Sequence, residues 1–286
     1  MMAWTTHDIL SATGGNLLSG AGHTAFAGIG IDSRQLTPDE LFIAIEGDIH
    51  DGHTFARDVV ARGGRGVLVR EGRTEKAVLT AWQDQQVVCI AVPDTTRALG
   101  DIAAYHRRRM PARVIALTGS NGKTTTRAMT AAILNRQGTT LATRGNLNNE
   151  IGLPLTLLQL KETHALAVVE MGMNHPGEID RMARMAAPDI GMIINVAPAH
   201  LEGLHSVEGV MRAKGELLGH IAPAGRAIFN GDDEHCRQLM ETCPVKTLLF
   251  GLGPEAPIRA TNLNSGPRGW TFHLQLPSGK IPVSLQ

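Results

Sequence analysis

The sequence predicts an α/β protein: a small N-terminal α/β domain, followed by a mostly parallel sheet with helices on both faces. Three observations lead to this prediction. With 286 residues, the chain is long enough for about two domains that each have a core. Short apolar runs alternate with helical patterns, which is typical of parallel sheets covered on both faces. A glycine-rich turn joins one of these strands directly to a helix.

The first domain is expected to span residues 1–111. Its apolar runs predict strands at 41–45, 66–69 and 87–92, and its helical patterns predict helices at 6–12, 54–62 and 95–109. The last helix ends in Arg107, Arg108 and Arg109, whose charge complements the helix dipole. Pro111 follows as a stop signal, so the second domain is expected at 112–286.

The second domain opens with the glycine-rich unit. The apolar run 114–117 predicts a buried strand, and the helix expected at 124–137 has Met129, Ala132 and Ile133 at helical spacing. Between these elements lie Gly119, Ser120, Asn121, Gly122, Lys123, Thr124 and Thr125. A strand, a glycine-rich turn and a helix in this order are the context of a phosphate-binding loop, so we predict a sheet of the P-loop ATPase type.

The residue types of this turn suit an anion. Gly119 and Gly122 allow the backbone to come close to a phosphate, while N–H groups and the helix N-terminus supply positive partial charge. Lys123 adds a full charge, and the Thr124 hydroxyl can bind a magnesium ion that bridges phosphates. Only two residues separate the two glycines, and Leu117 stands where the usual earlier glycine would be. An ordinary turn with a solvated lysine is the alternative, which the flanking strand and helix disfavour.

The remaining strands predict further polar residues at the same edge of the sheet. They are expected at 140–143, 165–170, 191–196, 227–230 and 247–250. The carboxyl ends of parallel strands meet at one edge, so Glu170 at a strand end and His200 just past one are candidate site residues. A glutamate beside a phosphate loop is placed to hold magnesium. The ordinary alternatives are a solvated glutamate and a hydrogen-bonded loop histidine.

Composition and charge argue against several classes. Lys plus Arg and Asp plus Glu both total 27, so no basic field indicates a nucleic-acid partner. The three cysteines lack C-x-x-C spacing, which argues against a disulfide framework or a zinc site. The N-terminal segment does not resemble a signal peptide, and no apolar run approaches about 20 residues. We expect a cytoplasmic monomer without a membrane partner.

Three segments resemble a known family. TGSNGKTT at 118–125 resembles the phosphate loop of the Mur ligase family, whose members use ATP to join an amino acid to a carboxylate. GNLNNEIGLPLTLLQL at 145–160 and EMGMNHPGEI at 170–179 are similar to the branch that adds D-alanyl-D-alanine to UDP-N-acetylmuramoyl-tripeptide in peptidoglycan synthesis. The resemblance covers essentially the whole chain. It implies these two compounds as substrates, reaction through an acyl phosphate, and ATP with two Mg2+ ions as cofactors.

The resemblance also implies contacts with substrate. In the N-terminal domain, Ser33 and Arg34 would contact the nucleotide sugar, although the same residues alone indicate an ordinary turn with a solvated arginine. In the second domain, Asn146, Asn148 and Asn149 would contact substrate.

Lys214 lies in a helix expected at 207–221, where a lysine is ordinarily solvated. In the Mur ligases a lysine in this context is carbamylated, and the segment AKGEL resembles that site. An ammonium group cannot ligate a metal, whereas a carbamate can. By this resemblance His200 and carbamylated Lys214 would hold one Mg2+. Thr124 and Glu170 would hold the other, and Lys123 would bind the β- and γ-phosphates of ATP.

The sequence departs from the family at its end. Family members continue with a P-G-R-H-N segment and a third α/β domain, whereas this sequence stops at SGKIPVSLQ, within an expected strand pair. We expect either a fragment of a longer protein or a naturally shortened chain. Other readings stay open: a non-catalytic remnant that binds ATP or UDP-sugar, a related ligase that adds the third residue, and a P-loop switch or kinase. The last of these lacks a base-recognition or acceptor motif.

Overall fold

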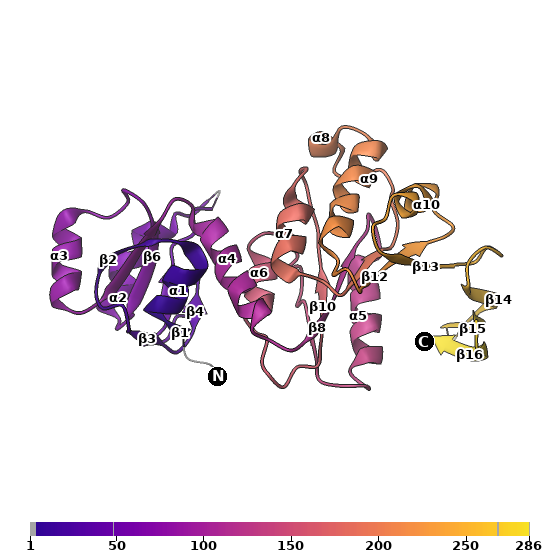
Figure 1. The fold of residues 1–286 in the computed structure, drawn as a ribbon, viewed down its shortest axis with the longest axis horizontal. Helices are drawn as coiled ribbons and strands as arrows, with labels where there is room; N and C mark the ends of the chain where they lie inside the picture. Colours follow the sequence, from indigo (N-terminus) through magenta and orange to yellow (C-terminus); the bar gives the residue numbers. More distant parts are fainter. Residues whose placement is uncertain (1–3, 48, 268, 286) are drawn as a thin grey trace. The chain divides into compact units, whose positions relative to one another are not determined.

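The computed structural model describes residues 4–47, 49–267 and 269–285. The chain divides into two compact units, Met1–Arg109 and Met110–Gln286, and each contains helices and a sheet of its own (Figure 1). The predicted α/β fold class is confirmed. The two units are described separately.

The first unit is built on a mixed sheet with the strand order β2-β7-β6-β5-β4. Strands β4 to β7 are parallel, and β2 joins β7 antiparallel. The strands β1 and β3 form a separate antiparallel pair. The described strands are β1 (Trp4–Thr5), β2 (Asn16–Ser19), β3 (Ala25–Phe26), β4 (Ile29–Gly30), β5 (Leu41–Ile43), β6 (Gly66–Arg70) and β7 (Val88–Val92). The helices are α1 (Thr6–Thr13), the 3-10 helix η1 (Gly52–Phe55), α2 (Ala56–Ala61), α3 (Lys76–Asp84) and α4 (Thr95–Arg108).

Apolar burial and a helix cap explain the main elements of this unit. The apolar runs of β6 and β7 are buried, as expected for inner strands covered on both faces. Phe42 and Cys89 of the sheet pack with Trp82 of α3 in one core cluster. Helix α1 begins with a capping box, in which the Thr5 hydroxyl accepts the Asp8 N–H and the Asp8 carboxylate accepts the Thr5 N–H.

Two predicted elements of the first unit differ in extent. The strand expected at 41–45 ends two residues earlier, because the Ile45 N–H turns back to the Ile43 carbonyl. The helix expected at 54–62 begins as the 3-10 helix η1, capped by Asp51, and becomes α-helical only in α2. Strands β1 to β4 are not predicted, because two to four residues are too few for a period to show.

The second unit is built on a longer sheet with the order β9-β10-β8-β11-β12-β13-β14-β15-β16. Strands β8 to β14 are parallel, and β14, β15 and β16 are antiparallel neighbours. The described strands are β8 (Arg113–Thr118), β9 (Thr140–Ala142), β10 (Leu166–Glu170), β11 (Ile190–Ile193), β12 (Arg226–Asn230), β13 (Lys246–Gly251), β14 (Ile258–Gly266), β15 (Gly269–Leu276) and β16 (Gly279–Leu285). The helices are α5 (Lys123–Leu134), α6 (Gly152–Leu157), α7 (Glu178–Ala186), α8 (Leu201–Leu204), α9 (Val207–Gly215), the 3-10 helix η2 (Glu216–His220) and α10 (Glu234–Glu241).

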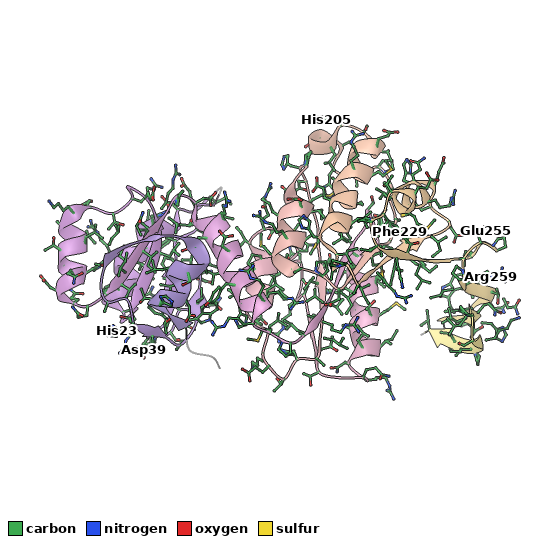
Figure 2. The ribbon with its side chains drawn as sticks, viewed as in Figure 1. His23, Asp39, His205, Phe229, Glu255 and Arg259 are labelled. Carbon is green, nitrogen blue, oxygen red and sulfur yellow. The ribbon has the colours of Figure 1, made fainter. Side chains whose placement is uncertain are left out.

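The crossover connections place helices on both faces of this sheet. Helix α5 connects β8 to β9, which lies toward one edge of the sheet. Helix α7 connects β10 to β11, which lies in the opposite direction along the sheet. Right-handed crossovers in opposite directions put the two helices on opposite faces, as Figure 1 shows. Figure 2 labels Phe229 of β12, which is fully buried, and His205, which ends α8 at the top of the view.

Helix α5 differs from its predicted packing. It ends at Leu134, three residues before the expected end of the helix 124–137. Two of its expected apolar-face residues, Met129 and Ile133, are 43% and 64% exposed. The buried residue of α5 is instead Arg127, so the face that turns inward carries a charge.

Two further predicted elements of the second unit are shorter than expected. Strand β11 ends before the expected limit of 191–196, because the Asp233 carboxylate accepts the Val196 N–H and draws it out of the ladder. The helix expected at 207–221 is α9 only as far as Gly215, and the tighter 3-10 helix η2 follows it.

Candidate active site

The predicted phosphate loop begins where β8 ends. Gly122 has φ +78°, a left-handed conformation that favours glycine, and it is the N-cap of α5. A Cβ on Gly119 would lie 3.1 Å from the Cβ of Ile194, so the loop approaches the end of β11 closely. The α5 N-terminus therefore lies beside the end of the neighbouring strand β11.

Hydrogen bonds tie this loop to the segment that follows β11. The Asn195 side chain accepts the Asn121 N–H at 2.9 Å and donates to the Asn121 carbonyl at 3.0 Å. The Ser120 hydroxyl donates to the Ala197 carbonyl and accepts the Ala197 N–H, both at 2.9 Å. The Ser120 N–H donates to the Asn195 carbonyl at 3.1 Å. The N–H groups of Ser120 and Asn121 are thus already engaged, and the loop is held rigidly against the connection that leads to His200.

Lys123 folds over its own loop. Its ammonium group donates to the Gly119 carbonyl at 2.7 Å and lies 3.4 Å from the Ser120 carbonyl. Partial burial lowers the pKa of Lys123, and the nearby Glu170 carboxylate opposes that shift. A positive charge is therefore held over the loop where a phosphate is predicted.

Glu170 is the last residue of β10, and hydrogen-bond donors surround its carboxylate. It is 2% exposed. Oε1 accepts from Nδ2 of Asn148 at 2.8 Å, and Oε2 lies 3.3 Å from both the Thr124 hydroxyl and Nη1 of Arg127. The Glu170 N–H donates to the Thr143 hydroxyl at 3.0 Å, which fixes the backbone of the strand end. The sequence predicts Thr124 and Glu170 as neighbours, but not the three other residues.

The donor set at Thr124 and Glu170 fits a magnesium ion. A hydroxyl and a carboxylate are hard oxygen ligands, which Mg2+ prefers. Among the described residues, no group of three or more histidine, cysteine, aspartate or glutamate side chains could hold a metal. Mg2+ is commonly bound by one or two protein ligands together with phosphate oxygens and water. The pair would therefore hold the ion only as part of such a shared shell.

His200 and Lys214 lie within electrostatic range of Lys123. His200 has φ +54° and precedes α8, and its pKa is lowered by partial burial and by the charges of Lys123 and Lys214. A left-handed conformation is uncommon for a non-glycine residue and occurs at many functional sites. Lys214, on α9, is 1% exposed, and burial together with Lys123 lowers its pKa to about 7. The structure thus brings together three residues that are predicted to be catalytic.

The predicted asparagine contacts have different surroundings. Asn148 is bonded to Glu170, as described above. The Asn149 side-chain oxygen accepts the N–H groups of Ile151 and Gly152, at 3.2 and 2.8 Å, and so orders the start of α6. Asn146 is exposed, and so is Thr125 of the loop.

Ser33 and Arg34 lie in the first unit, on an open hollow of about 460 Å³. Its lining residues are Ser33, Arg34, Phe55, Asp58, Ala61 and Arg62. The Arg34 guanidinium forms a fork with the Asp32 carboxylate through two contacts of 2.9 Å, and it lowers the pKa of Asp32 to about 2. Arg62 donates to the Ser33 carbonyl at 2.6 Å. Two guanidinium groups therefore border the hollow.

Arg127 and Asn195 are candidate site residues that the sequence patterns do not indicate. Arg127 lies one helical turn after Lys123, and from the sequence alone an arginine at this position of a helix is expected to be solvated. Asn195 reads as an ordinary residue after a strand. The sequence indicates these two residues only through their position, because both lie within five residues of a predicted site residue.

None of the helices in the described part of the chain has the length and apolar character that a membrane span needs.

Two protein-family models match the chain. The model described as "Mur ligase middle domain" matches residues 117–286, which is more than half of the chain. The model described as "Mur ligase family, catalytic domain" matches residues 25–107.

Two curated relatives carry the same name. UDP-N-acetylmuramoyl-tripeptide--D-alanyl-D-alanine ligase of Escherichia coli (strain K12) is 40% identical over 257 residues, which are 89% of this chain and 54% of the relative. Its namesake in Bacillus subtilis (strain 168) is 36% identical over 252 residues, 88% of this chain and 53% of the relative. The chain spans about half the length of the curated relatives it matches.

Solved structures show the same similarity. A crystal structure of MurF from Acinetobacter baumannii has a TM-score of 0.90 and 36% identity, and the match covers 100% of this chain and 61% of that one. The MurF ligase of Thermotoga maritima, solved in complex with ADP, has a TM-score of 0.79 and 25% identity, with 90% of this chain and 57% of that one covered. The fold described above is therefore shared over nearly the whole of this chain.

Proposed function

The chain belongs to the Mur ligase family, and we propose that it acts in an ATP-dependent, ADP-forming ligase that joins D-alanyl-D-alanine to UDP-N-acetylmuramoyl-tripeptide. The observation that carries this proposal is the cluster at the carboxyl ends of β8 and β10. There the phosphate loop, Lys123 and Thr124 lie beside the buried carboxylate of Glu170. The names of the relatives supply the substrates.

The chemistry begins with the substrate carboxylate. A carboxylate is a poor acyl donor, because its oxygen is a poor leaving group. Transfer of the γ-phosphoryl group of ATP gives an acyl phosphate and ADP, and the amine of the dipeptide then displaces phosphate to form the amide. The protein aligns the reactants and stabilises the charge on the transferring group.

We assign roles in this reaction to residues of the second unit. The loop 119–125 binds the phosphates of ATP, and Lys123 neutralises charge on the β- and γ-phosphates. Thr124 and Glu170 would hold one Mg2+, and His200 with carbamylated Lys214 would hold a second. Bound magnesium supplies positive charge that reduces repulsion between the substrate carboxylate and ATP.

Lys214 has an environment that suits carbamylation. Its pKa is lowered to about 7, so a large fraction of the amine is neutral and nucleophilic near neutral pH. The amine nitrogen forms a bond to the carbon of CO2 and releases one proton to solvent. The product is an anionic carbamate, whose charge is attracted to the neighbouring Lys123. Its oxygens are ligands that Mg2+ accepts.

The first unit is proposed to bind the nucleotide-sugar part of the tripeptide substrate. Ser33 and Arg34 line its hollow, and an arginine suits a diphosphate, which would share the Arg34 guanidinium with Asp32. In the second unit, Asn146 and Asn149 are proposed substrate contacts. We propose residues 1–111 as the UDP-sugar domain and 112–286 as the ATP domain. We also propose a cytoplasmic location, because ATP is available in the cytoplasm, and a monomeric protein. Neither a nucleic acid nor a membrane is a proposed partner.

The experiment that tests the proposal measures two quantities on the 286-residue chain. The first is ADP binding by calorimetry with Mg2+ present. The second is release of phosphate and formation of the amide from ATP, UDP-N-acetylmuramoyl-tripeptide and D-alanyl-D-alanine, followed by mass spectrometry. Binding with amide formation supports the ligase. Binding without amide formation is expected of a nucleotide-binding remnant and of a ligase fragment alike, and amide formation by the protein isolated from its source then separates the two. Failure to bind ADP contradicts both.

A further inference from the structure

Arg127 is a buried charge beside the proposed magnesium site. Its side chain is 11% exposed. Nη1 donates to the Gly145 carbonyl at 2.8 Å and lies 3.3 Å from Oε2 of Glu170. Burying a guanidinium is costly unless it is paired and hydrogen-bonded, and these two contacts meet that need. None of the roles assigned under the proposed function involves Arg127.

The contacts of Arg127 connect three parts of the site. It lies on α5, four residues after Lys123, so it moves with the phosphate loop. Its bond to Gly145 holds the start of the loop that carries Asn148. Asn148 and Arg127 then hold different oxygens of the Glu170 carboxylate. The orientation of that carboxylate depends on both.

The charges around Glu170 oppose a divalent cation in the absence of nucleotide. The carboxylate contributes one negative charge, whereas Arg127 and Lys123 each contribute a positive charge. Thr124 and Asn148, which also face the carboxylate, are neutral. Without nucleotide, a metal ion would thus approach a site whose charge is already overcompensated. The phosphates of ATP reverse this balance.

We propose that Arg127 is a positioning residue that makes metal binding at Glu170 depend on the nucleotide. It aims the carboxylate and offsets its charge, so that the metal binds together with phosphates and only weakly to the free protein. This inference rests on the proposed nucleotide-binding function. It predicts a reciprocal coupling, in which nucleotide increases metal affinity and metal increases nucleotide affinity by the same factor.

The test is Mn2+ binding to the 286-residue chain, followed by electron paramagnetic resonance with and without ADP. The variants are Arg127→Met, which removes the charge, and Arg127→Lys, which keeps it. Glu170→Gln identifies the signal that belongs to this site and not to surface carboxylates. Thermal unfolding confirms that each variant is folded. Arg127→Gln keeps a donor for the Gly145 carbonyl and replaces the Met variant if that one does not fold.

In the wild-type protein and Arg127→Lys, ADP should strengthen Mn2+ binding strongly. In Arg127→Met, Mn2+ should bind at least about tenfold more tightly without ADP, because a positive charge no longer repels the ion, and ADP should strengthen it less. Free-protein Mn2+ affinity that is unchanged or lower in a folded Arg127→Met or Arg127→Gln would overturn the inference. Failure of the wild-type protein to bind ADP would overturn the proposed function, while the comparison without ADP would still decide the effect of Arg127.

Discussion

The side-chain amide of Asn148 donates a 2.8 Å hydrogen bond to Oε1 of Glu170, although the two residues are 22 positions apart in the chain. Glu170 is the most deeply buried carboxylate of the candidate site, and Asn148 holds the oxygen that Arg127 does not contact. The bond joins the loop before α6 to the end of β10. It means that the proposed metal ligand is oriented before any ligand binds.

Asn148→Leu should destabilise the second unit. The variant leaves Oε1 of a buried carboxylate with only the long 3.5 Å contact from the Thr124 hydroxyl, which costs about 1–3 kcal/mol. Urea unfolding of the 286-residue chain measures the change. Asn146→Leu in the same loop is the control, because Asn146 is exposed, and its free energy of unfolding should change by less than about 0.5 kcal/mol. Equal effects of the two variants would show that the Glu170 contact contributes nothing.

Lys123→Ala should remove phosphate release from ATP. The ammonium group lies over the phosphate loop, and loss of one such stabilising group lowers turnover by about 100- to 1000-fold. A phosphate-release assay on the proposed ligase measures it. Lys280→Ala, which alters an exposed lysine of β16, is the matched control and should keep full turnover. Unchanged turnover in Lys123→Ala would contradict the assignment of the loop.

Lys214→Met should raise stability near neutral pH and change its pH dependence. The pKa of Lys214 is lowered from 10.5 to about 7, so between these values the unfolded chain binds a proton that the folded chain does not. Stability of the wild-type protein therefore rises with pH through that window, and the cost of charging Lys214 is fully present below it. The variant lacks this cost, which is on the order of a few kcal/mol.

The measurement is urea unfolding from about pH 6 to pH 10.5 in buffer free of CO2. The stability difference between Lys214→Met and the wild-type protein should be largest near pH 6 and shrink as pH rises. Lys76→Met, at an exposed position, should show no such trend. A difference that does not change with pH would mean that Lys214 is charged in the folded protein. In a separate experiment with 13C-labelled bicarbonate, the wild-type protein should show a carbamate signal by NMR and Lys214→Met should not.

Asn195→Ala should weaken ADP binding. The variant loses both bonds between the Asn195 side chain and the Asn121 backbone, and each is worth about 0.5–1.5 kcal/mol. The expected loss of affinity is therefore about fivefold to 100-fold, measured by calorimetry. Asn264→Ala in β14, where the side chain makes only a local bond to the Asn262 carbonyl, should bind ADP normally. Wild-type ADP affinity in Asn195→Ala would show that these two hydrogen bonds are dispensable for nucleotide binding.

Arg34→Ala should weaken UDP binding to the first unit. A guanidinium bound to a charged group contributes about 1.5–3 kcal/mol, which corresponds to a loss of about tenfold to 100-fold in affinity. Calorimetry with UDP measures it. Arg57→Ala is the control, because Arg57 forms an exposed ion pair with Glu75 and is not among the residues that line the hollow. If both variants bind UDP as the wild-type protein does, the hollow is not the nucleotide-sugar site.

The sequence alone determined the features that depend on local order. Helix α4 ends within one residue of its predicted limit, and so does β8, because apolar period, charge at the helix end and the stop at Pro111 all lie within one segment. The phosphate loop is recognisable for the same reason. Glu170 is predicted at the carboxyl end of a strand, where it lies, because the end of an apolar run is itself a local signal.

Only the tertiary structure decided which distant residues meet. Asn121 and Asn195 are 74 positions apart, and their pairing follows from the adjacency of β8 and β11 in the sheet. The burial of Lys214 and of Arg127 has the same origin, since a charged residue on a helix reads as solvated until the packing of that helix is known. Apolar periodicity in the sequence predicts which face of a helix or strand favours burial. It does not predict a buried charge, because the stability of that charge depends on a partner that the fold brings from elsewhere in the chain.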